Sequence, residues 1–352
     1  MFVSGLGTAN PPKRYTKAEC WQAFADSGSF GQLNPRARRV LDNVLHQDNG
    51  IHTRHLALDA LADAFDIDPD TLHRRFLAQA PTLAGEAAQR ALADAGLAPA
   101  DIDAVVVSTC TGYLCPGLSG YVVQALGLRP DVKAYDLVGQ GCAAALPNWQ
   151  LCDGLLGAGR CRHTLSVCVE ICSAAMYLDN DPGVIISACL FGDGAGAAVL
   201  SAAPPVDKRR IEWMDSASFI DTTEREALRF EQCHGLLRNI LTRRVPRLAA
   251  GYARHVLDDV LQSAGLTTKD INAWIMHAGG RDVLIALEST LGIGQHELRY
   301  SAAMLHDYGN LSSAFVYFVL QAALADSAPG GWWWMSSFGA GFSCHGALLK
   351  VD

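Results

Sequence analysis

The chain has 352 residues, half of them hydrophobic and only 18% charged, with a formal net charge of −8. A chain this acidic offers no overall attraction for nucleic acid or an anionic membrane, and no apolar run approaches the ~20 residues that span a bilayer. The length allows about two domains, the low charge points to a subunit interface, and the start carries no export signal, so we expect a cytoplasmic protein.

Two distant segments align without a gap, LADAGLAPADIDAVVVSTCTG from Leu92 and LQSAGLTTKDINAWIMHAGG from Leu261. At a constant offset of 169 (261 minus 92), seven positions agree. Each copy predicts a helix ending at glycine, a turn, and a continuously apolar strand covered on both faces. With helical stretches at 82–94 and 246–264, the sequence predicts α/β layers around mostly parallel sheets. The alternative is that AGL-x3-DI is a generic helix-to-strand turn.

Further echoes keep the same order along the chain. GC at Gly141 corresponds to GN at Gly309, and FGDG at Phe191 corresponds to FGAG at Phe338. Together they predict two similar halves, residues 1–203 and 204–352, joined at the Ala-Ala-Pro-Pro stretch 202–205.

Three residues lie where helix-like or strand-like runs begin or end, which is a common place for catalytic side chains. Cys142 follows Gly141 at the head of a helix-like Ala-Ala-Ala-Leu, and His277 closes an apolar strand-like run before Ala-Gly-Gly. Asn310 precedes a helix-like run, a position that suits a helix N-terminal turn. A thiol at a helix N-terminus beside an imidazole has a lowered pKa and becomes a nucleophile, so the three form a candidate catalytic set. The alternatives are a packed thiol and a capping asparagine.

Other patterns point to packing. The eleven cysteines are an odd number, scattered and without C-x2-C pairs, which predicts reduced, buried thiols and no metal site. The stretch 192–197 fits the dinucleotide pattern G-x-G-x-x-A, but a strand-like run follows where a helix is required, so no dinucleotide is expected. The three tryptophans at 332–334 are expected to pack between layers, with alternate rings on opposite faces.

These residues resemble a known family, the type III polyketide synthases or chalcone synthase family. The similar motifs are GTANPP from Gly7, GC at Cys142, LFGDGAGA from Leu190, HAGG from His277, YGNLSSA from Tyr308 and FGAGF from Phe338. The resemblance implies a thiolase fold with five α/β/α/β/α layers and a homodimer. It also implies iterative decarboxylative condensation of malonyl-CoA onto an acyl starter, then cyclisation to a resorcinol-, phloroglucinol- or pyrone-type product, without a cofactor.

The resemblance also implies roles for residues. Cys142 matches the nucleophile that carries the acyl chain, and His277 with Asn310 matches the pair that activates the thiol and then stabilises the enolate left by decarboxylation. Phe191 matches an aromatic gate, with an ordinary core phenylalanine as the alternative. Cys115 matches a residue that reaches across the dimer. Further substrate-binding candidates are Cys110, Thr111, Cys172, Ala175, Ser312, Gly339 and Gly341.

The chain departs from the plant enzymes of the family in its basic residues. Where those carry ligands for the CoA phosphates, this chain has Leu41, Val44 and Asp48. The nearest basic cluster is Arg36, Arg38 and Arg39, which we take as weak CoA-binding candidates. An acyl carrier protein is therefore an alternative donor of the starter.

Other departures concern the pocket and the helix after the thiol. The second aromatic residue of the gate is replaced near Asn239, and small side chains at Cys172 and Ala175 suggest room for an aliphatic starter or a longer intermediate. Pro147 lacks a backbone N–H five residues after Cys142, which predicts a kinked or later-starting helix.

Two other functions stay open at this point. A β-ketoacyl-[acyl-carrier-protein] synthase III shares the three residues and FGDGAGA but performs a single condensation. A non-catalytic dimeric scaffold would merely pack Cys142.

Overall fold

The computed structural model describes all 352 residues, as a regular alternation of helices and strands. The helices are α1 (Lys17–Asp26), α2 (Gly28–Gln32), α3 (Pro35–His46), α4 (Pro69–Ala95), α5 (Leu118–Leu126), α6 (Ala145–Gly157), α7 (Pro182–Leu190), α8 (Val245–Ala264), α9 (Arg281–Leu291), α10 (Arg299–Tyr308) and α11 (Phe315–Ala325). The strands are β1 (Phe2–Ala9), β2 (Arg14–Thr16), β3 (Thr53–His55), β4 (Ala104–Ser108), β5 (Lys133–Leu137), β6 (His163–Glu170), β7 (Gly194–Ser201), β8 (Ile211–Ile220), β9 (Leu228–Cys233), β10 (Leu236–Leu241), β11 (Ile271–Met276), β12 (Gly331–Gly339) and β13 (Ser343–Val351).

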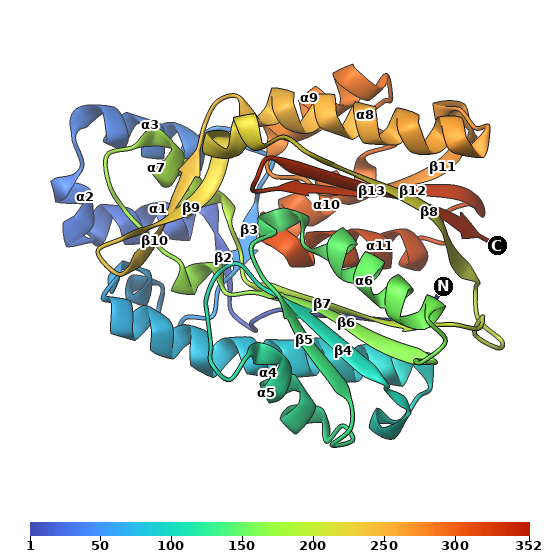
Figure 1. The fold of residues 1–352 in the computed structure, drawn as a ribbon. Helices are drawn as coiled ribbons and strands as arrows, with labels where there is room; N and C mark the ends of the chain where they lie inside the picture. The colour runs from blue at the N-terminus through green and yellow to red at the C-terminus, as the bar shows by residue number, and fades with distance from the viewer.

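Five layers of secondary structure follow one another through the molecule (Figure 1). Helices α8 and α9 cover the outer face of one sheet, and α4 and α5 cover the outer face of the other. Helices α6, α10 and α11 lie between the sheets, where α6 and α11 contact strands of both. The α/β/α/β/α order expected of a thiolase fold is confirmed. No helix combines the length and apolar character needed to cross a bilayer.

The strands pair in the order β11-β12-β13-β8-β1-β7-β6-β4-β5, and a single residue pair, Phe2 with Glu212, joins the two sheets. Strand β4 runs parallel to β5 and β6, and β11 runs parallel to β12, but every other neighbour is antiparallel. The expectation of mostly parallel sheets was therefore wrong. Strands β12 and β13 show one reason, because the residues 340–342 that join them are too few for a parallel crossover.

The two segments that align in the sequence adopt the same local structure. Helices α4 and α8 end at Gly96 and Gly265, whose φ/ψ angles are 66°/28° and 67°/29°, the left-handed region that glycine favours. A short 3₁₀ turn follows each, at 99–101 and 268–270, and leads into β4 or β11. The division at 203/204 would fall between β7 and β8, and it stays a proposal.

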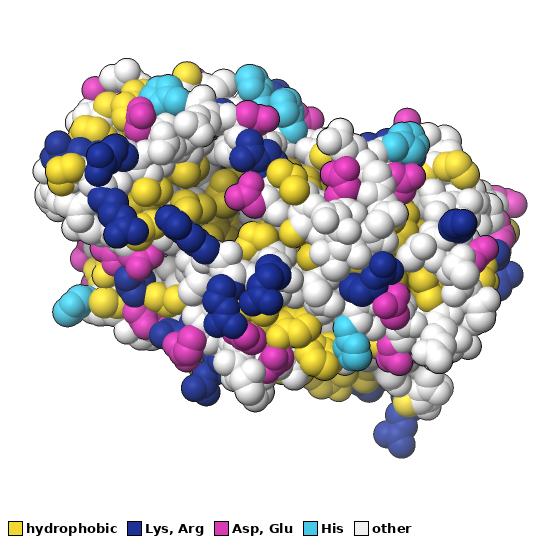
Figure 2. Space-filling model, turned by 90° about the horizontal axis from the view of Figure 1, so that it is seen from above, with side chains coloured by type: hydrophobic (Ala, Val, Ile, Leu, Met, Phe, Trp, Pro, Cys, Tyr) yellow, Lys and Arg dark blue, Asp and Glu magenta, His cyan; other side chains and the backbone are white.

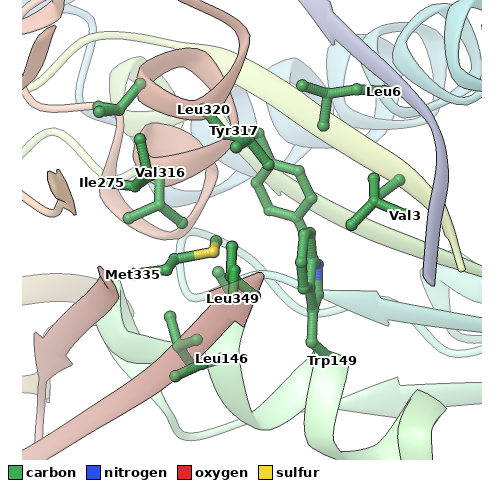
Figure 3. Packing of buried hydrophobic residues seen from close by; sticks show 14 of the residues in the cluster. Val3, Leu6, Leu146, Trp149, Ile275, Val316, Tyr317, Leu320, Met335 and Leu349 are labelled. Atoms are coloured by element: carbon green, nitrogen blue, oxygen red, sulfur yellow. The ribbon is translucent and has the colours of Figure 1, made fainter. Parts of the chain in front are cut away.

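The core between the sheets is built around two aromatic side chains from the middle helices (Figure 3). Trp149 of α6 donates its indole N–H to the hydroxyl of Tyr317 on α11 at 3.0 Å, and the Ser166 hydroxyl lies 2.7 Å from the same oxygen. Gly196 of β7 allows this approach, because a Cβ there would lie 2.5 Å from the Tyr317 ring. The segment that mimics a dinucleotide motif therefore runs into a strand packed against a helix, as expected.

The three consecutive tryptophans of β12 pack on the two faces of their sheet, as the alternation of side chains in a strand predicts. Trp333 is buried among the residues of the middle helices, and Trp334 is buried under α8 and α9. Trp332 is partly buried, and the ammonium group of Lys350 lies over its ring.

A smaller lobe contains α1, α2, α3 and α7, which share their own hydrophobic cluster. The hairpin of β9 and β10 lies beside α7 (Figure 1). This lobe forms the outer side of the candidate site.

Candidate active site

Cys142 lies in a 3₁₀ turn, Gly141–Ala143, that follows β5 and precedes α6. Helix α6 begins only at Ala145, so Pro147 falls in its first turn, where a backbone N–H has no intrahelical partner. The sequence predicted a kink or a later start, and the later start is what the structure has. The nucleophile candidate therefore stands just ahead of the helix.

The end of β12 holds this turn in place. Ser337 Oγ donates to Ala143 O at 2.9 Å, and a Cβ on Gly339 would lie 2.6 Å from the backbone N of Ala143. Gly339 thus supports the turn from behind and does not line the cavity, and neither does Gly341. Of the FGAGF motif, the cavity-lining residue is Ala340, and Gly339 contributes to the site only by supporting the turn.

His277 follows β11 directly and is fully buried. Its ring packs edge-on against Phe315 and Phe338, with ring centroids 5.3 and 4.9 Å apart. Neither ring nitrogen has a hydrogen-bond partner. Burial lowers the pKa of His277 to about 3, so its imidazole is neutral at physiological pH.

Asn310 joins the loop after His277 to the turn that precedes α11. Its Nδ2 donates to Gly279 O at 3.3 Å, and its Oδ1 accepts from the Ser312 backbone N at 2.8 Å. Its backbone pairs with the segment of Phe191 as an isolated bridge. The side chain therefore caps the turn, as the structural alternative proposed, while it keeps one N–H without a partner.

The thiol of Cys142 has one side-chain hydrogen-bond partner, Ser312 Oγ at 3.3 Å. Burial raises its pKa to about 12, and the nearby Glu170 charge acts in the same direction. The expectation of a lowered pKa was wrong for this state of the protein. Desolvation penalises the thiolate more than the Ser312 contact favours it, and no hydrogen bond joins the sulfur to His277.

A fully buried carboxylate, Glu170, lies beneath the cavity wall and was missed by the sequence reasoning. Its Oε2 accepts from Cys110 N at 3.0 Å and from Thr111 Oγ1 at 2.9 Å, and its Oε1 accepts from the hydroxyls of Ser312 (3.3 Å) and Ser313. Burial raises its pKa, and these hydrogen bonds counteract the rise. An ionisable residue at the end of an apolar strand was the available signal, the same one that singled out His277.

The cavity encloses about 780 Å³, including its open mouth. Figure 2 shows a hollow with hydrophobic side chains on its floor and Lys or Arg side chains around it. Seven of the residues selected from the sequence line this cavity, namely Cys142, Phe191, Cys110, Thr111, Cys172, Ala175 and Ser312. His277 and Asn310 lie buried behind the wall that carries Ser312 and Phe191.

A second missed residue, Arg54, is a buried cation on the cavity wall. Its Nη1 donates to the carbonyls of Ala188 (2.8 Å) and Phe191 (2.9 Å), and its Nη2 donates to Cys20 Sγ at 3.2 Å. No carboxylate pairs with it. Arg54 therefore holds the end of α7 in position and with it the candidate gate, Phe191.

The remaining candidates lie away from the cavity. Cys115 is exposed and does not line it. Arg36, Arg38 and Arg39 lie on α3, and Arg38 is already engaged, because it donates to Gly31 O at 2.7 Å and its guanidinium lies over a neighbouring aromatic ring. All eleven cysteines are free, and no cluster of three metal-ligating side chains is present.

Comparison with known proteins gives the same family in both halves of the chain. Residues 62–215 match the model of the FAE1/type III polyketide synthase-like proteins, and residues 219–351 match that of the C-terminal domain of chalcone and stilbene synthases. The chain is 33% identical to a 1,3,6,8-tetrahydroxynaphthalene synthase of Streptomyces peucetius, over 99% of this chain and 92% of the relative. It is 31% identical to a 3,5-dihydroxyphenylacetyl-CoA synthase of Amycolatopsis orientalis, over 75% and 72% of the two chains.

A polyketide synthase of Mycobacterium tuberculosis described as acting in alpha-pyrone synthesis is 28% identical, over 99% of this chain and 91% of the relative. Among solved structures, PKS-I from the brown alga Ectocarpus siliculosus superposes with a TM-score of 0.90 at 26% identity, covering 99% of this chain and 98% of that one.

Proposed function

The chain belongs to the type III polyketide synthases, acyltransferases that condense malonyl-CoA, and on that premise we propose that it extends an acyl starter bound to Cys142 by repeated decarboxylative condensation. The product would then cyclise to a resorcinol, phloroglucinol or pyrone. The names of the relatives, which include a tetrahydroxynaphthalene synthase and an enzyme of alpha-pyrone synthesis, support an aromatic or pyrone product. The observation that carries the proposal is a largely apolar cavity that Cys142 lines, with Ser312 hydrogen-bonded to both Cys142 and Asn310 and with His277 buried close behind.

In the loading step, Cys142 Sγ would attack the starter thioester and form a new thioester. The thiol and the imidazole are both neutral in the free protein, because burial raises the pKa of Cys142 to about 12 and lowers that of His277 to about 3. A neutral imidazole can accept the thiol proton as the S–C bond forms, and the proton leaves on the CoA sulfur. Moving this proton only during attack avoids a lasting buried ion pair.

In the extension step, malonyl-CoA would lose carbon dioxide and leave an enolate whose oxygen carries the charge. The unused N–H of Asn310 and a ring N–H of His277 are the donors available to that oxygen. The enolate carbon then attacks the acyl carbon on Cys142, and the thiolate leaves. The packing of His277 between Phe315 and Phe338 keeps water from the ring, which strengthens both hydrogen bonds.

We further propose that the protein works as a homodimer and takes its starter from CoA or from an acyl carrier protein. Exposed hydrophobic side chains near the edge strand β5 support the dimer, with Tyr113 74% and Val138 60% exposed and Cys115 between them in sequence. Arg36 and Arg39, which have no ion-pair partner, stay the candidates for the CoA phosphates.

The decisive experiment counts the malonyl units in each product. Purified protein with malonyl-CoA and a panel of acyl-CoA starters should release products that contain more than one malonyl unit, counted by mass spectrometry. A single unit in every product would favour the β-ketoacyl synthase alternative.

Cys142→Ala should abolish acyl transfer yet keep slow carbon dioxide release, whereas Asn310→Ala should load acyl groups and condense about 10²-fold more slowly. Complete loss of carbon dioxide release in folded Cys142→Ala would refute this division of roles.

A further inference from the structure

One wall of the cavity is built by α7 and the β9–β10 hairpin and carries a single side-chain amide, Asn239. Its neighbours on this wall include the hydrophobic residues Val184, Leu228 and Phe230, the last of which pairs with Asn239 across the hairpin. Asn239 is only 8% exposed. An amide is an unusual choice for a wall of this character, because burying one without partners is costly.

The orientation of this amide follows from its hydrogen bonds. Ser187 Oγ donates its proton to Gly183 O at 2.8 Å, so toward Asn239 it can only accept. Asn239 Nδ2 lies 3.0 Å from that oxygen and donates to it. Oδ1 and the second N–H then have no partner in the protein, and both belong to a side chain that lines the cavity.

The other hydroxyl groups that line the cavity already donate their protons to acceptors within the protein. Thr111 donates to Glu170, and Ser173 donates to Asp193 at 2.6 Å. The Ser312 hydroxyl donates to Glu170 or to Cys142 Sγ, and the Tyr177 hydroxyl donates to Cys233 Sγ at 3.4 Å. The amide of Asn239 is therefore the neutral group of this wall with both an acceptor and a donor left for a ligand. A ligand that satisfies it must offer a proton to Oδ1 and an oxygen to the N–H.

Resting on the proposed function, we propose that Asn239 selects acyl chains that carry a hydroxyl or enolisable keto oxygen away from the thioester, over plain aliphatic chains of the same length. A hydroxyl or enol can donate to Oδ1 and accept from the N–H, so it satisfies both free positions of the amide. A methylene at the same place leaves both of them desolvated and unpaired. The small side chains of Cys172 and Ala175 leave room in the cavity for an acyl chain. We expect the chain that occupies this room to carry an oxygen, whereas the sequence alone suggested an aliphatic starter or a longer intermediate.

The test compares matched starters that differ in one oxygen. Hexanoyl-CoA is paired with 6-hydroxyhexanoyl-CoA, and octanoyl-CoA with 8-hydroxyoctanoyl-CoA, and kcat/KM for malonyl-dependent product is measured for each. The wild-type protein should prefer the hydroxylated member by roughly five- to tenfold at one of the two lengths, the effect of one or two neutral hydrogen bonds. Asn239→Leu, which is close in shape, should abolish the preference and still extend hexanoyl-CoA.

Two further variants keep the result interpretable. Asn239→Thr replaces the amide by one hydroxyl, which can both donate and accept, on a strand-compatible side chain. It should keep part of the preference, and it also serves if the leucine variant does not fold. Ile240→Leu is the matched control, since the next residue of β10 points to the opposite face, and it should keep the full preference.

Contrary results would overturn either the role of Asn239 or the proposed function. Equal kcat/KM for both members of each pair in wild-type protein, or a preference that survives in Asn239→Leu, overturns the assignment. A KM for malonyl-CoA that rises equally with all starters in Asn239→Leu also overturns it, because the amide would then bind the pantetheine arm common to every substrate. Absence of malonyl-dependent product from every starter in wild-type protein would refute the proposed function itself, and the inference with it.

Discussion

Replacing Glu170 tests how strongly the buried carboxylate organises the cavity. In Glu170→Gln the amide oxygen can keep the Cys110 N–H and the Thr111 hydroxyl, while Ser312 and Ser313 rotate their hydroxyls to accept from the new NH2. What is lost is the charge assistance, about 1 kcal/mol, and a buried charge disappears at the same time. We expect the glutamine variant to be destabilised by no more than about 1 kcal/mol.

Glu170→Ala differs because the Cys110 N–H cannot rotate. This backbone donor would be left buried without a partner, which costs about 1–3 kcal/mol, and the missing side-chain atoms leave a cavity that costs a similar amount. The sum is about 2–6 kcal/mol. Urea unfolding midpoints at pH 7 and equal protein concentration measure the difference. Equal midpoints for the alanine and glutamine variants would refute the idea that Glu170 stabilises the fold mainly through the hydrogen bonds it accepts and not through its charge.

The same pair of variants has a chemical readout. Because the Glu170 charge helps to raise the pKa of Cys142, its removal in Glu170→Gln should lower that pKa and shift the pH profile of iodoacetamide alkylation to lower pH. The alkylated residue is identified by peptide mass spectrometry, with Cys142→Ala as the blank. A profile that stays in place or moves to higher pH would contradict the electrostatic coupling.

Three more outcomes follow from the site. Ala175→Phe should shift products toward fewer malonyl units at constant Cys142 loading, because a close-packed wall has no space for the ring, and an unchanged product mass distribution would make Ala175 ordinary packing. Burial holds the pKa of His277 near 3 whereas an unfolded histidine titrates near 6.5, so the unfolded chain binds the extra proton and the free energy of unfolding should fall by up to about 1.4 kcal/mol per pH unit between pH 6 and 4. Replacing His277 by Gln should remove the contribution of one proton to the pH dependence of the free energy of unfolding. An unaltered dependence would contradict the lowered pKa of His277. Changing Arg36 and Arg39 together to Ala should raise KM for malonyl-CoA much more than it lowers kcat, and an unchanged KM would show that CoA is held elsewhere.

Local patterns were enough to find many of the elements and to select the three candidate catalytic residues. Continuous apolar runs identified β4 and β11, and the glycines after α4 and α8 marked helix ends that the structure repeats within a degree or two. Cys142, His277 and Asn310 stood out because each sits where a regular element begins or ends, and that is a property of the nearest few residues. The later start of α6 was also readable, since proline removes one N–H.

What the sequence could not supply depends on contacts between distant segments. Strand direction in the sheets, the buried Glu170 and its donors, and the use of Arg54 to hold the Phe191 segment all need residues far apart in the chain to be placed together. The ionisation of Cys142 is the clearest case: a helix start predicts a lowered pKa, yet burial raises it to about 12. Periodicity and turn chemistry act over a few residues and are written in the sequence, whereas desolvation and hydrogen-bond partners are set by whatever the tertiary fold brings alongside.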